Sequence, residues 1–336
     1  MSAVLDMGVE PSRIVYAHTC KLTSDIRYAA QVNVDLMTFD NQEELRKIKA
    51  AFPSSRLLLR IDPPSNFKVL HELGNKFGCH PLDASSLLRT ARDLRLNVVG
   101  VSFHVGCGAE NPEIFAAAVR SAATVFDEAQ ALGFHFHILD VGGGFPSSLV
   151  SFGQVAEVLR TALDLHFPDK RKVRIMAEPG RYLVETAFSL TVTVIAKRRA
   201  SPRVASNDDS MEGSKGGEVF GYYVNDGVFG SFNCLYADMA HQFLEARLVN
   251  PTKSPEKYGS NVWGPTCDGI DKILSDVMLP ELQVGDVINF EDMGAYSLST
   301  ASGFNGIPRP LVLYHCCDTV WKKLFPTDTL TEDSEQ

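Results

Sequence analysis

Three short motifs hold the residue types that proteins use to bind a charged cofactor. They are Asp-Val-Gly-Gly-Gly-Phe-Pro at 140–146, Ala-Glu-Pro-Gly-Arg at 177–181 and Trp-Gly-Pro-Thr-Cys-Asp-Gly at 263–269. Glycine has no Cβ, so its backbone N–H can approach a phosphate closely, and arginine offers the same dianion a planar fork of donors. Glu178 lies three residues before Arg181. Together these residue types predict a site for a phosphorylated ring cofactor with a carboxylate partner.

The elements that would position these motifs alternate along the first half of the chain. Apolar, β-branched runs predict strands at 14–18, 36–40, 57–61, 98–105, 137–141 and 173–177. Helical patterns lie between them at 24–31, 42–51, 84–94, 112–132 and 153–165. Asp40-Asn41 followed by Glu43 and Glu44 predicts a helix start, and Gly133 predicts a helix end. Such alternation indicates parallel strands with crossover helices, either in a doubly wound sheet or in a (β/α) barrel.

The positions of the motifs favour the barrel. His104, the glycines at 142–144 and the Glu178–Arg181 pair all follow the predicted ends of successive strands. Barrel enzymes build their sites at these carboxyl ends, whereas a doubly wound sheet concentrates its ligand at one switch point. We therefore expect an α/β class chain with a barrel domain over residues 1–187.

The pattern changes after Glu185. Strand-like runs at 188–196, 219–224, 286–290 and 310–315 follow one another without long helices, which predicts an all-β domain over 188–325. A polar segment at 201–217 predicts a mobile surface loop, and the acidic residues 326–336 predict a disordered tail. With 336 residues, the chain is long enough for both domains.

Charge and apolar patterning exclude several classes of partner. The net charge of −9 argues against nucleic-acid binding, and the basic run 197–199 is typical of a solvated strand edge. The sequence has no apolar run of the roughly 18–20 residues that a membrane span needs. It shows no secretory signal at 1–13. We therefore expect neither nucleic-acid nor membrane partners.

Cysteine and histidine usage also bears on location and metal binding. The seven cysteines are odd in number and scattered, so they predict no disulfide framework and favour a reducing, cytoplasmic compartment. His135 and His137 share one face of a strand, but no third ligand accompanies them. We predict no metal site.

Several colinear stretches point to one family. Besides the three motifs, they are Val-Val-Gly-Val-Ser-Phe-His-Val at 98–105, Tyr-Val-Asn-Asp-Gly-Val-Phe-Gly-Ser-Phe-Asn-Cys at 223–234, residues 292–296 and residues 304–306. From about residue 8 to 314 the chain resembles the eukaryotic ornithine decarboxylase and antizyme inhibitor family. This family belongs to the pyridoxal-phosphate enzymes with an alanine-racemase-like barrel and a C-terminal β-domain.

The resemblance implies which residues bind the cofactor. These are His104, Cys107, Gly142, Gly143, Gly144, Glu178, Gly180, Arg181 and Tyr296. In this family the histidine stacks on the ring, the glycines, arginine and tyrosine hold the phosphate, and the glutamate pairs with the ring nitrogen. Cys107 departs from the pattern, because the family has serine there and a thiol is a weaker hydrogen-bond donor.

The resemblance also implies roles in the reaction. Cys267 would protonate the carbon that loses carbon dioxide, with His104 and Glu178 also catalytic, and Asp238 and Asp268 would bind the distal ammonium of the substrate. Each residue has a simpler alternative: a strand-end histidine is often structural, and a cysteine often behaves as a small apolar side chain. A glycine run can be only a tight turn. The residues around Asp238 differ from the family pattern, which leaves substrate identity less certain than reaction class.

The partners implied by the resemblance are an amino acid, a second subunit and a regulator. Ornithine is the first candidate substrate, in a putrescine-forming step of polyamine synthesis. Homodimers with shared sites are implied, since Cys267 and Asp268 reach the neighbouring site in this family. Residues 9–40 correspond to the segment through which the family binds antizyme.

One family element has no counterpart. The Schiff-base lysine lies in a Phe-Tyr-Ala-Val-Lys stretch on the first barrel strand, and this sequence contains no such stretch. Lys21 and Lys76 match other parts of the family pattern. The chain begins before what corresponds to the third strand, so we expect six barrel strands with open edges. Two interpretations stay open: a shortened form of a decarboxylase, or a catalytically inactive antizyme-inhibitor-like regulator.

Overall fold

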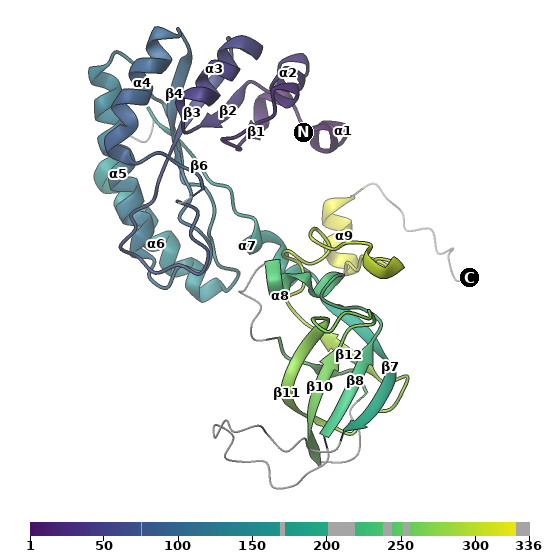
Figure 1. Ribbon diagram of the computed structural model, residues 1–336. Coiled ribbons are helices and arrows are strands. Elements are labelled where there is room, and N and C mark those ends of the chain that lie inside the picture. The colour runs from purple at the N-terminus through teal and green to yellow at the C-terminus, as the bar shows by residue number, and fades with distance from the viewer. Residues whose placement is uncertain (75, 169–171, 201–218, 238–243, 251–255, 327–336) are drawn as a thin grey trace.

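The computed structural model describes residues 1–336 except 75, 169–171, 201–218, 238–243, 251–255 and 327–336. Two six-stranded sheets occupy separate parts of the molecule (Figure 1). The first has the order β1-β2-β3-β4-β5-β6 and the second β11-β10-β8-β7-β12-β9. The short helices α7 (Arg181–Val184) and η3 (Glu185–Ala187) connect the two parts.

The first sheet is parallel throughout. Its strands are β1 (Val15–Tyr16), β2 (Leu36–Phe39), β3 (Arg56–Ile61), β4 (Asn97–Phe103), β5 (Ile138–Asp140) and β6 (Arg174–Met176). Among the described residues, β1 and β6 each have one neighbouring strand, so the curled sheet stays open at both edges. The predicted α/β class, with a barrel that lacks strands, is confirmed.

Helices cover the outer face of this sheet (Figure 1). They are α1 (Ser2–Asp6), α2 (Thr23–Gln31), α3 (Gln42–Ala51), α4 (Ala84–Asp93), α5 (Glu113–Ala131) and α6 (Leu149–His166). Phe39, Leu59 and Val101 of the strands pack with Phe115 and Val119 of α5 in one core. Each such buried side chain contributes about 1.5–3 kcal/mol, so this core fixes the strands that carry the site.

Local signals set the helix ends as predicted. The Asn41 side chain accepts a hydrogen bond from the Glu44 N–H at 2.9 Å and so caps α3. Gly133, after α5, adopts a φ of +86°, a conformation that glycine tolerates best. Helix α6 begins at Leu149, earlier than the pattern indicated, and includes Gly153.

The second sheet is mixed, because β8 runs parallel to β10 and antiparallel to β7. Its strands are β7 (Leu190–Ala200), β8 (Val219–Val224), β9 (Arg247–Leu248), β10 (Lys257–Trp263), β11 (Lys272–Pro280) and β12 (Val287–Phe290). Short helices α8 (Cys234–Ala237) and α9 (Asp318–Leu324) accompany them. Val192, Tyr222, Phe232 and Phe290 belong to a separate core. The boundary at 187/188 stays a prediction.

One predicted strand is wrong. Residues 310–315 pair with no strand in the described structure, and Leu311, Leu313 and Tyr314 are 83%, 80% and 87% exposed. A short continuous run of apolar residues favours an extended backbone, but only a neighbouring strand turns it into a sheet. The sequence also gave no signal for β10 and β11, whose residues alternate less regularly.

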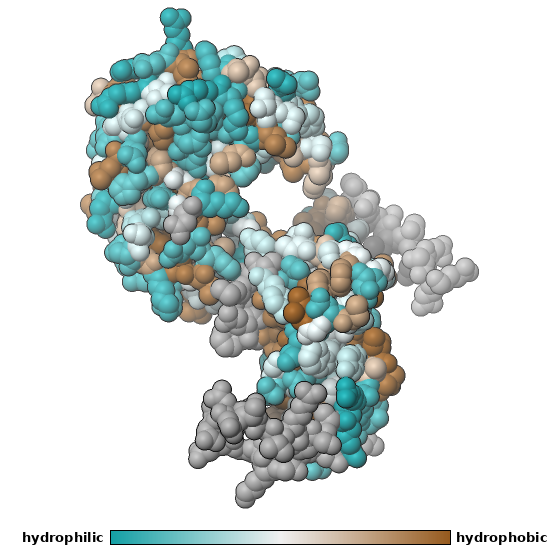
Figure 2. Space-filling view, viewed as in Figure 1, coloured by the Kyte–Doolittle hydropathy of each residue, from teal (hydrophilic) through white to brown (hydrophobic). Residues whose placement is uncertain are grey.

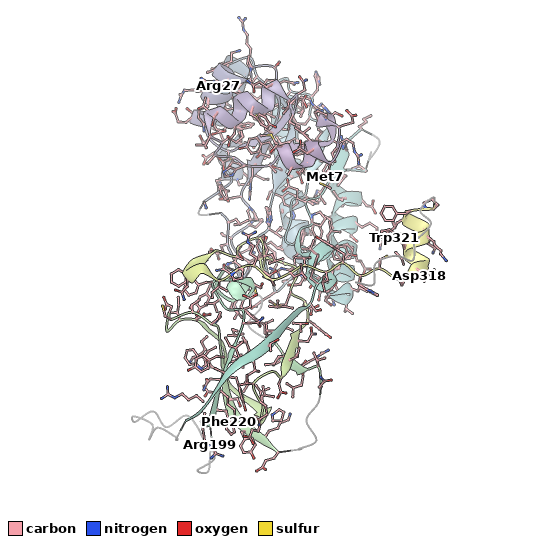
Figure 3. All side chains as sticks on the ribbon, turned by 90° about the vertical axis from the view of Figure 1, so that its right-hand side faces the viewer. Met7, Arg27, Arg199, Phe220, Asp318 and Trp321 are labelled. Carbon is pink, nitrogen blue, oxygen red and sulfur yellow. The ribbon has the colours of Figure 1, made fainter. Side chains whose placement is uncertain are left out.

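The visible surface of the first part is largely hydrophilic (Figure 2), and the basic run 197–199 lies in the second part. In the second part, Lys197 and Arg199 lie 4.7 and 5.9 Å from the centre of the Phe220 ring. Arg199 and Phe220 lie at the end of the molecule away from Arg27 (Figure 3). Arg198 and Arg199 are exposed to solvent, as predicted, but the run is not on an edge strand, because β7 lies between β8 and β12 and this part of it pairs with β8. The predicted loop at 201–217 and nearly all of the predicted tail lie outside the described residues. Within the described chain, no helix combines the length and apolar character needed to cross a membrane.

Candidate active site

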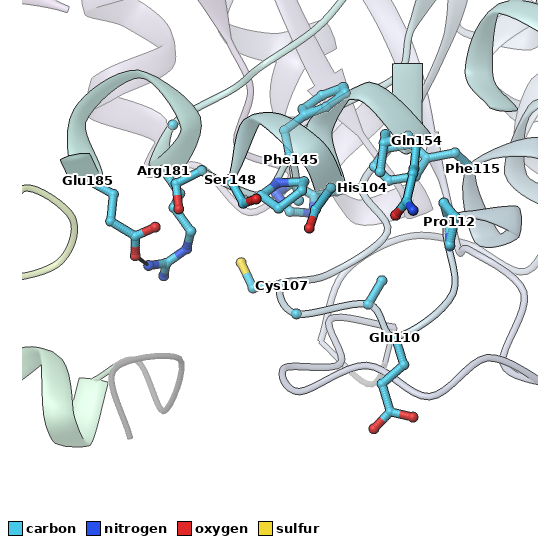
Figure 4. A pocket seen from close by; sticks show the side chains of 18 of the residues that line it. His104, Cys107, Glu110, Pro112, Phe115, Phe145, Ser148, Gln154, Arg181 and Glu185 are labelled. Atoms are coloured by element: carbon cyan, nitrogen blue, oxygen red, sulfur yellow. Dashed lines mark hydrogen bonds and ion pairs between the residues drawn. The ribbon is translucent and has the colours of Figure 1, made fainter. Parts of the chain in front are cut away.

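A cavity of about 410 Å³ opens beyond the carboxyl ends of β4 to β6 (Figure 4). Its lining includes His104, Gly144, Glu178 and Arg181 from the first part and Tyr296 from the second. Cys107 and Gly180 also line it. The structure therefore brings together most of the residues that the sequence indicated for the cofactor. Small-molecule sites have volumes of roughly 300–1,000 Å³, so the cavity is large enough for a cofactor.

The glycine turn after β5 lies tightly against the loop after β4. A Cβ placed on Gly142 would lie 1.9 Å from the Phe103 carbonyl oxygen, and one on Gly144 would lie 2.2 Å from the Gly106 carbonyl oxygen. Gly142 and Gly144 also have φ values of +62° and +98°. Any other residue would clash and strain the backbone here. The turn thus gives close access to backbone groups at the cavity wall.

Glu178 lies beside a buried carboxyl group, Asp140. The Asp140 Oδ1 accepts the Gly142 N–H at 2.9 Å, and the Glu178 N–H donates to the Gly142 carbonyl at 2.7 Å. Burial and the Asp140 charge raise the pKa of Glu178 to about 8. Glu178 keeps an exposed face, where solvent weakens the effect of burial, so we attribute much of the upward pKa shift to Asp140, which is 0% exposed.

A proton on Glu178 would also reduce the repulsion with its neighbour, Asp140. The Asp140 Oδ2 is buried and receives no hydrogen bond from an N–H or hydroxyl group of the described residues. The charge of Asp140 acts on the Glu178 carboxyl, and burial raises the pKa of Asp140 as well. Since two neighbouring carboxylates repel one another, the pair retains one proton. Glu178 can therefore exchange a proton with a ring nitrogen at neutral pH.

His104 is a neutral, fixed ring. Burial, followed by the charge of Arg60, lowers the pKa of His104 to about 4. Its Nδ1 accepts the Gly106 N–H at 3.1 Å, so the neutral tautomer carries its proton on Nε2. A Cβ on Gly143 would lie 2.6 Å from this Nε2. The histidine thus lies across the glycine turn and presents a flat apolar surface.

The cation of the site is Arg181, the first residue of α7. Its guanidinium lies 5.4 Å from the ring of Tyr296, 43% of which is exposed. Arg181 also forms an ion pair with Glu185 (Figure 4). Cys107 lies within the electrostatic reach of Arg181; burial raises the pKa of its thiol, which therefore stays protonated.

Two groups near the site were not identified from the sequence. Arg60 of β3 lies among the charges of Glu178, Asp40, Asp140 and Asp62, and burial lowers its pKa. A charge inside the apolar run at 57–61 was the available signal. Glu185 was also missed, although a glutamate four residues after an arginine is a typical helical ion pair.

The residues assigned to substrate lie elsewhere. Cys267 and Asp268 are exposed, in the loop between β10 and β11, and neither lines the cavity. Asp238 lies outside the described residues. A single chain therefore does not bring Cys267 and Asp268 to the cofactor cavity. Their assigned roles stay predictions.

Lys21 is not directed at the cavity. Its ammonium is buried, 2.9 Å from Glu44 Oε1, and donates to the carbonyls of His18 and Thr38 at 2.9 and 2.6 Å. No lysine is among the described residues that line the cavity. These contacts make Lys21 a structural residue that ties α3 to the loop after β1.

The donor set fits a phosphorylated pyridine. Arg181 and the tight glycine turn suit a phosphate, the flat neutral ring of His104 suits stacking, and the protonated carboxyl of Glu178 suits a ring nitrogen. The described residues include no group of three or more metal-ligating side chains placed to hold an ion. The fold and the site thus define a pyridoxal-phosphate type of site on an α/β barrel-like sheet.

Comparison with known proteins agrees with this class. Residues 1–185 match the family model for the pyridoxal binding domain of pyridoxal-dependent decarboxylases. Mouse ornithine decarboxylase is 45% identical over 323 residues, which cover 95% of this chain and 69% of that protein. Antizyme inhibitor 2 of Xenopus laevis is also 45% identical, over 324 residues, with the same two coverages.

Solved structures show the same fold. The arginine decarboxylase of Paramecium bursaria Chlorella virus, bound to agmatine, superposes with a TM-score of 0.82 at 34% identity, covering 92% of this chain and 78% of that one. A lysine/ornithine decarboxylase from Vibrio vulnificus, complexed with putrescine, gives 0.76 at 29% identity, covering 92% and 77%. The chain belongs to the family of pyridoxal-dependent decarboxylases, and within it to the group of eukaryotic ornithine decarboxylases and antizyme inhibitors.

Proposed function

We propose that this protein binds pyridoxal phosphate and takes part in decarboxylating a basic amino acid, with ornithine as the first candidate. The observation that carries the proposal is the convergence of His104, the glycine turn, Glu178 and Arg181 on one cavity. A cation for phosphate and a protonated carboxyl for a ring nitrogen are the groups that this cofactor needs. The mouse relative, an ornithine decarboxylase, supports ornithine as the substrate.

Five of the residues that line the cavity would have tasks in this reaction. When bound, pyridoxal phosphate supplies an electron-withdrawing ring that stabilises the charge left as carbon dioxide departs. Arg181 and Gly144 would hold the phosphate, with Tyr296 beside the guanidinium. His104 would support one face of the ring. Glu178 would keep a proton at the ring nitrogen, which increases the electron withdrawal.

The substrate end of the site would come from a second subunit. Cys267 and Asp268 are exposed on one chain, and the loop that holds them is well anchored: Asp271 accepts hydrogen bonds from the Thr266 N–H and hydroxyl at 2.9 and 2.7 Å. We propose that this loop enters the neighbouring cavity of a homodimer. There Cys267 would give a proton to the substrate carbon, and Asp268, with Asp238, would bind the distal ammonium.

The direct test supplies this chain with pyridoxal phosphate and carboxyl-labelled ornithine, lysine or arginine. Labelled carbon dioxide and the matching amine, with ornithine the best substrate, are the products expected of a decarboxylase. Because the family's Schiff-base lysine has no counterpart in this sequence, binding of pyridoxal phosphate without any amine would favour the regulator. Glu178→Gln should lower the rate because a neutral amide cannot hold the ring nitrogen protonated. Glu157→Gln, an exposed carboxyl on α6, serves as the control. Equal rates for wild type and Glu178→Gln would contradict the proposal.

A mixing experiment tests the shared site. Cys267→Ala and Glu178→Gln place their defects in different halves of the proposed composite site. If the two subunits share sites, mixed dimers regain one intact site, up to about a quarter of wild-type activity for random pairing. No recovery after mixing, with dimers shown by sedimentation, would exclude sharing.

A second candidate function is regulation by binding antizyme. Its support is the Xenopus antizyme inhibitor 2, as similar to this chain as the mouse enzyme. The segment 9–40 includes α2, on which Arg27 is exposed. Binding of antizyme by wild type and its loss in Arg27→Glu, with no amine produced, would favour this role. Arg120→Glu on α5 is a matched control.

Two coarser predictions also remain proposals. We place the domain boundary at 187/188, between the parts that hold the two sheets. We also propose a cytoplasmic location, because all seven cysteines are free thiols and four of them are exposed. Fractionation with a fluorescent fusion tests the location.

A further inference from the structure

The positively charged residue of the cavity, Arg181, is already paired with a carboxylate. Glu185 and Arg181 both line the cavity, and a guanidinium N–H of Arg181 donates to the Glu185 Oε1 (Figure 4). The pair spans one turn, from the start of α7 to η3. Glu185 therefore contacts the same group that would bind the phosphate.

This ion pair is shielded from water. The two side chains are only 11% and 10% exposed, so solvent and salt screen their charges weakly. The backbone of Glu185 is also fixed, because its carbonyl accepts the Gly294 N–H at 3.0 Å. A Cβ on Gly294 would lie 1.7 Å from the Val184 carbonyl oxygen, which shows how closely the two segments pack. The backbone of Glu185 therefore cannot move away from Arg181 without disturbing this contact.

The charge around the cavity increases the importance of Glu185. Among the described lining residues, Arg181 is the one lysine or arginine, while Glu110, Glu178 and Glu185 are carboxyl groups. Glu110 is largely exposed and pairs with Lys68 at 2.5 Å. Glu178 is largely protonated at neutral pH, because its pKa is raised to about 8. Glu185 is therefore the carboxylate that most directly offsets the attraction of Arg181 for a phosphate dianion.

We infer that Glu185 determines the affinity of the site, competing with the cofactor phosphate for the Arg181 guanidinium. This inference rests on the proposed function, which assigns the phosphate to Arg181. A phosphate that binds must share the N–H donors of Arg181 with Glu185. It must also lie close to the negative charge of Glu185, which repels it. The cavity then binds phosphorylated ligands weakly and releases them readily. The Cys107 thiol, a weak donor, does not compensate for this loss.

The test is calorimetric titration of the full chain with inorganic phosphate and, separately, with pyridoxal phosphate. The proteins are wild type, Glu185→Gln, Glu185→Ala and Glu110→Gln. Glu185→Gln keeps the shape of the side chain and an oxygen that can accept from Arg181, and circular dichroism confirms folding. Glu110→Gln is the matched control, because it removes one carboxylate from the same cavity but at its exposed mouth.

Both Glu185 variants should bind phosphate roughly tenfold more tightly than wild type, the scale of one charge-assisted hydrogen bond. Glu110→Gln should change the affinity by less than about twofold, because its charge is screened. Unchanged phosphate affinity in the Glu185 variants, an equal gain in Glu110→Gln, or no phosphate binding by any protein would overturn the inference. Tighter phosphate binding without any binding of pyridoxal phosphate would instead uphold it and contradict the proposed function.

Discussion

Asp140, the last residue of β5, and Glu178, two residues after β6, form an interacting pair of carboxyl groups on neighbouring parallel strands. The pairing follows from register, since Asp140 lies opposite Met176, which comes two residues before Glu178. Asp140 is fully buried, whereas Glu178 faces the cavity. This arrangement keeps a proton beside the place where a ring nitrogen would bind.

The carboxyl pair predicts how stability depends on pH. The folded chain raises the pKa of Glu178 to about 8, from 4.5, so between these values the folded state binds more protons than the unfolded state. The stabilisation from this proton is complete below about pH 4.5 and is lost as the pH rises through about 8. Glu178→Gln removes this dependence, so the variant should gain stability relative to wild type from pH 5 to pH 8.

The expected gain is on the order of 1 kcal/mol, after allowance for the solvent that reaches Glu178. Urea unfolding at pH 5 and pH 8 measures it, with Glu157→Gln as the exposed control. A difference between wild type and Glu178→Gln that stays constant with pH would show that Glu178 titrates normally.

The positive charge of Arg60 influences the protonation of two groups in the site. Its charge lowers the pKa of His104 and of Glu178. Arg60→Met should therefore raise the pKa of His104 from about 4, although burial will keep it below the ordinary value of 6.5. NMR titration of the His104 ring measures the change. Arg56→Met on the same strand removes a cation that pairs with Asp35 and should leave His104 unchanged; a similar shift in both variants would contradict the assignment.

Lys21 should contribute to stability and not to cofactor binding. Lys21→Ala leaves Glu44 with Lys47 alone and leaves the carbonyls of His18 and Thr38 without this donor, a loss of about 3 kcal/mol. Urea unfolding should show this loss, while exposed Lys76→Ala should stay within about 0.5 kcal/mol of wild type. Pyridoxal phosphate binding should persist in folded Lys21→Ala; its disappearance would place Lys21 at the cofactor.

Cys107 should weaken the phosphate end of the site. Cys107→Ser replaces a weak donor with a hydroxyl in the reach of Arg181, so phosphate should bind a few-fold, about two to five times, more tightly. Calorimetry with inorganic phosphate measures the gain. Cys20→Ser, at an exposed cysteine, is the control. Weaker binding in Cys107→Ser would mean that the thiol does not face the phosphate.

The sequence by itself determined the local features. Apolar runs with turn residues between them predicted all six parallel strands, because burial of strands leaves a short-range pattern in the chain. Asn41 predicted the start of α3, since capping involves residues only three positions apart. The glycines at 142–144 indicated a close backbone approach before any partner was known.

The tertiary structure decided which distant residues meet. The Asp140–Glu178 pair and the position of Arg60 depend on the order and register of β3, β5 and β6, which no local pattern encodes. Residues 310–315 have the pattern of a strand but no neighbour to bond with. Cys267 does not line the cavity. Its loop is built from local contacts, but what it faces depends on how the whole chain packs.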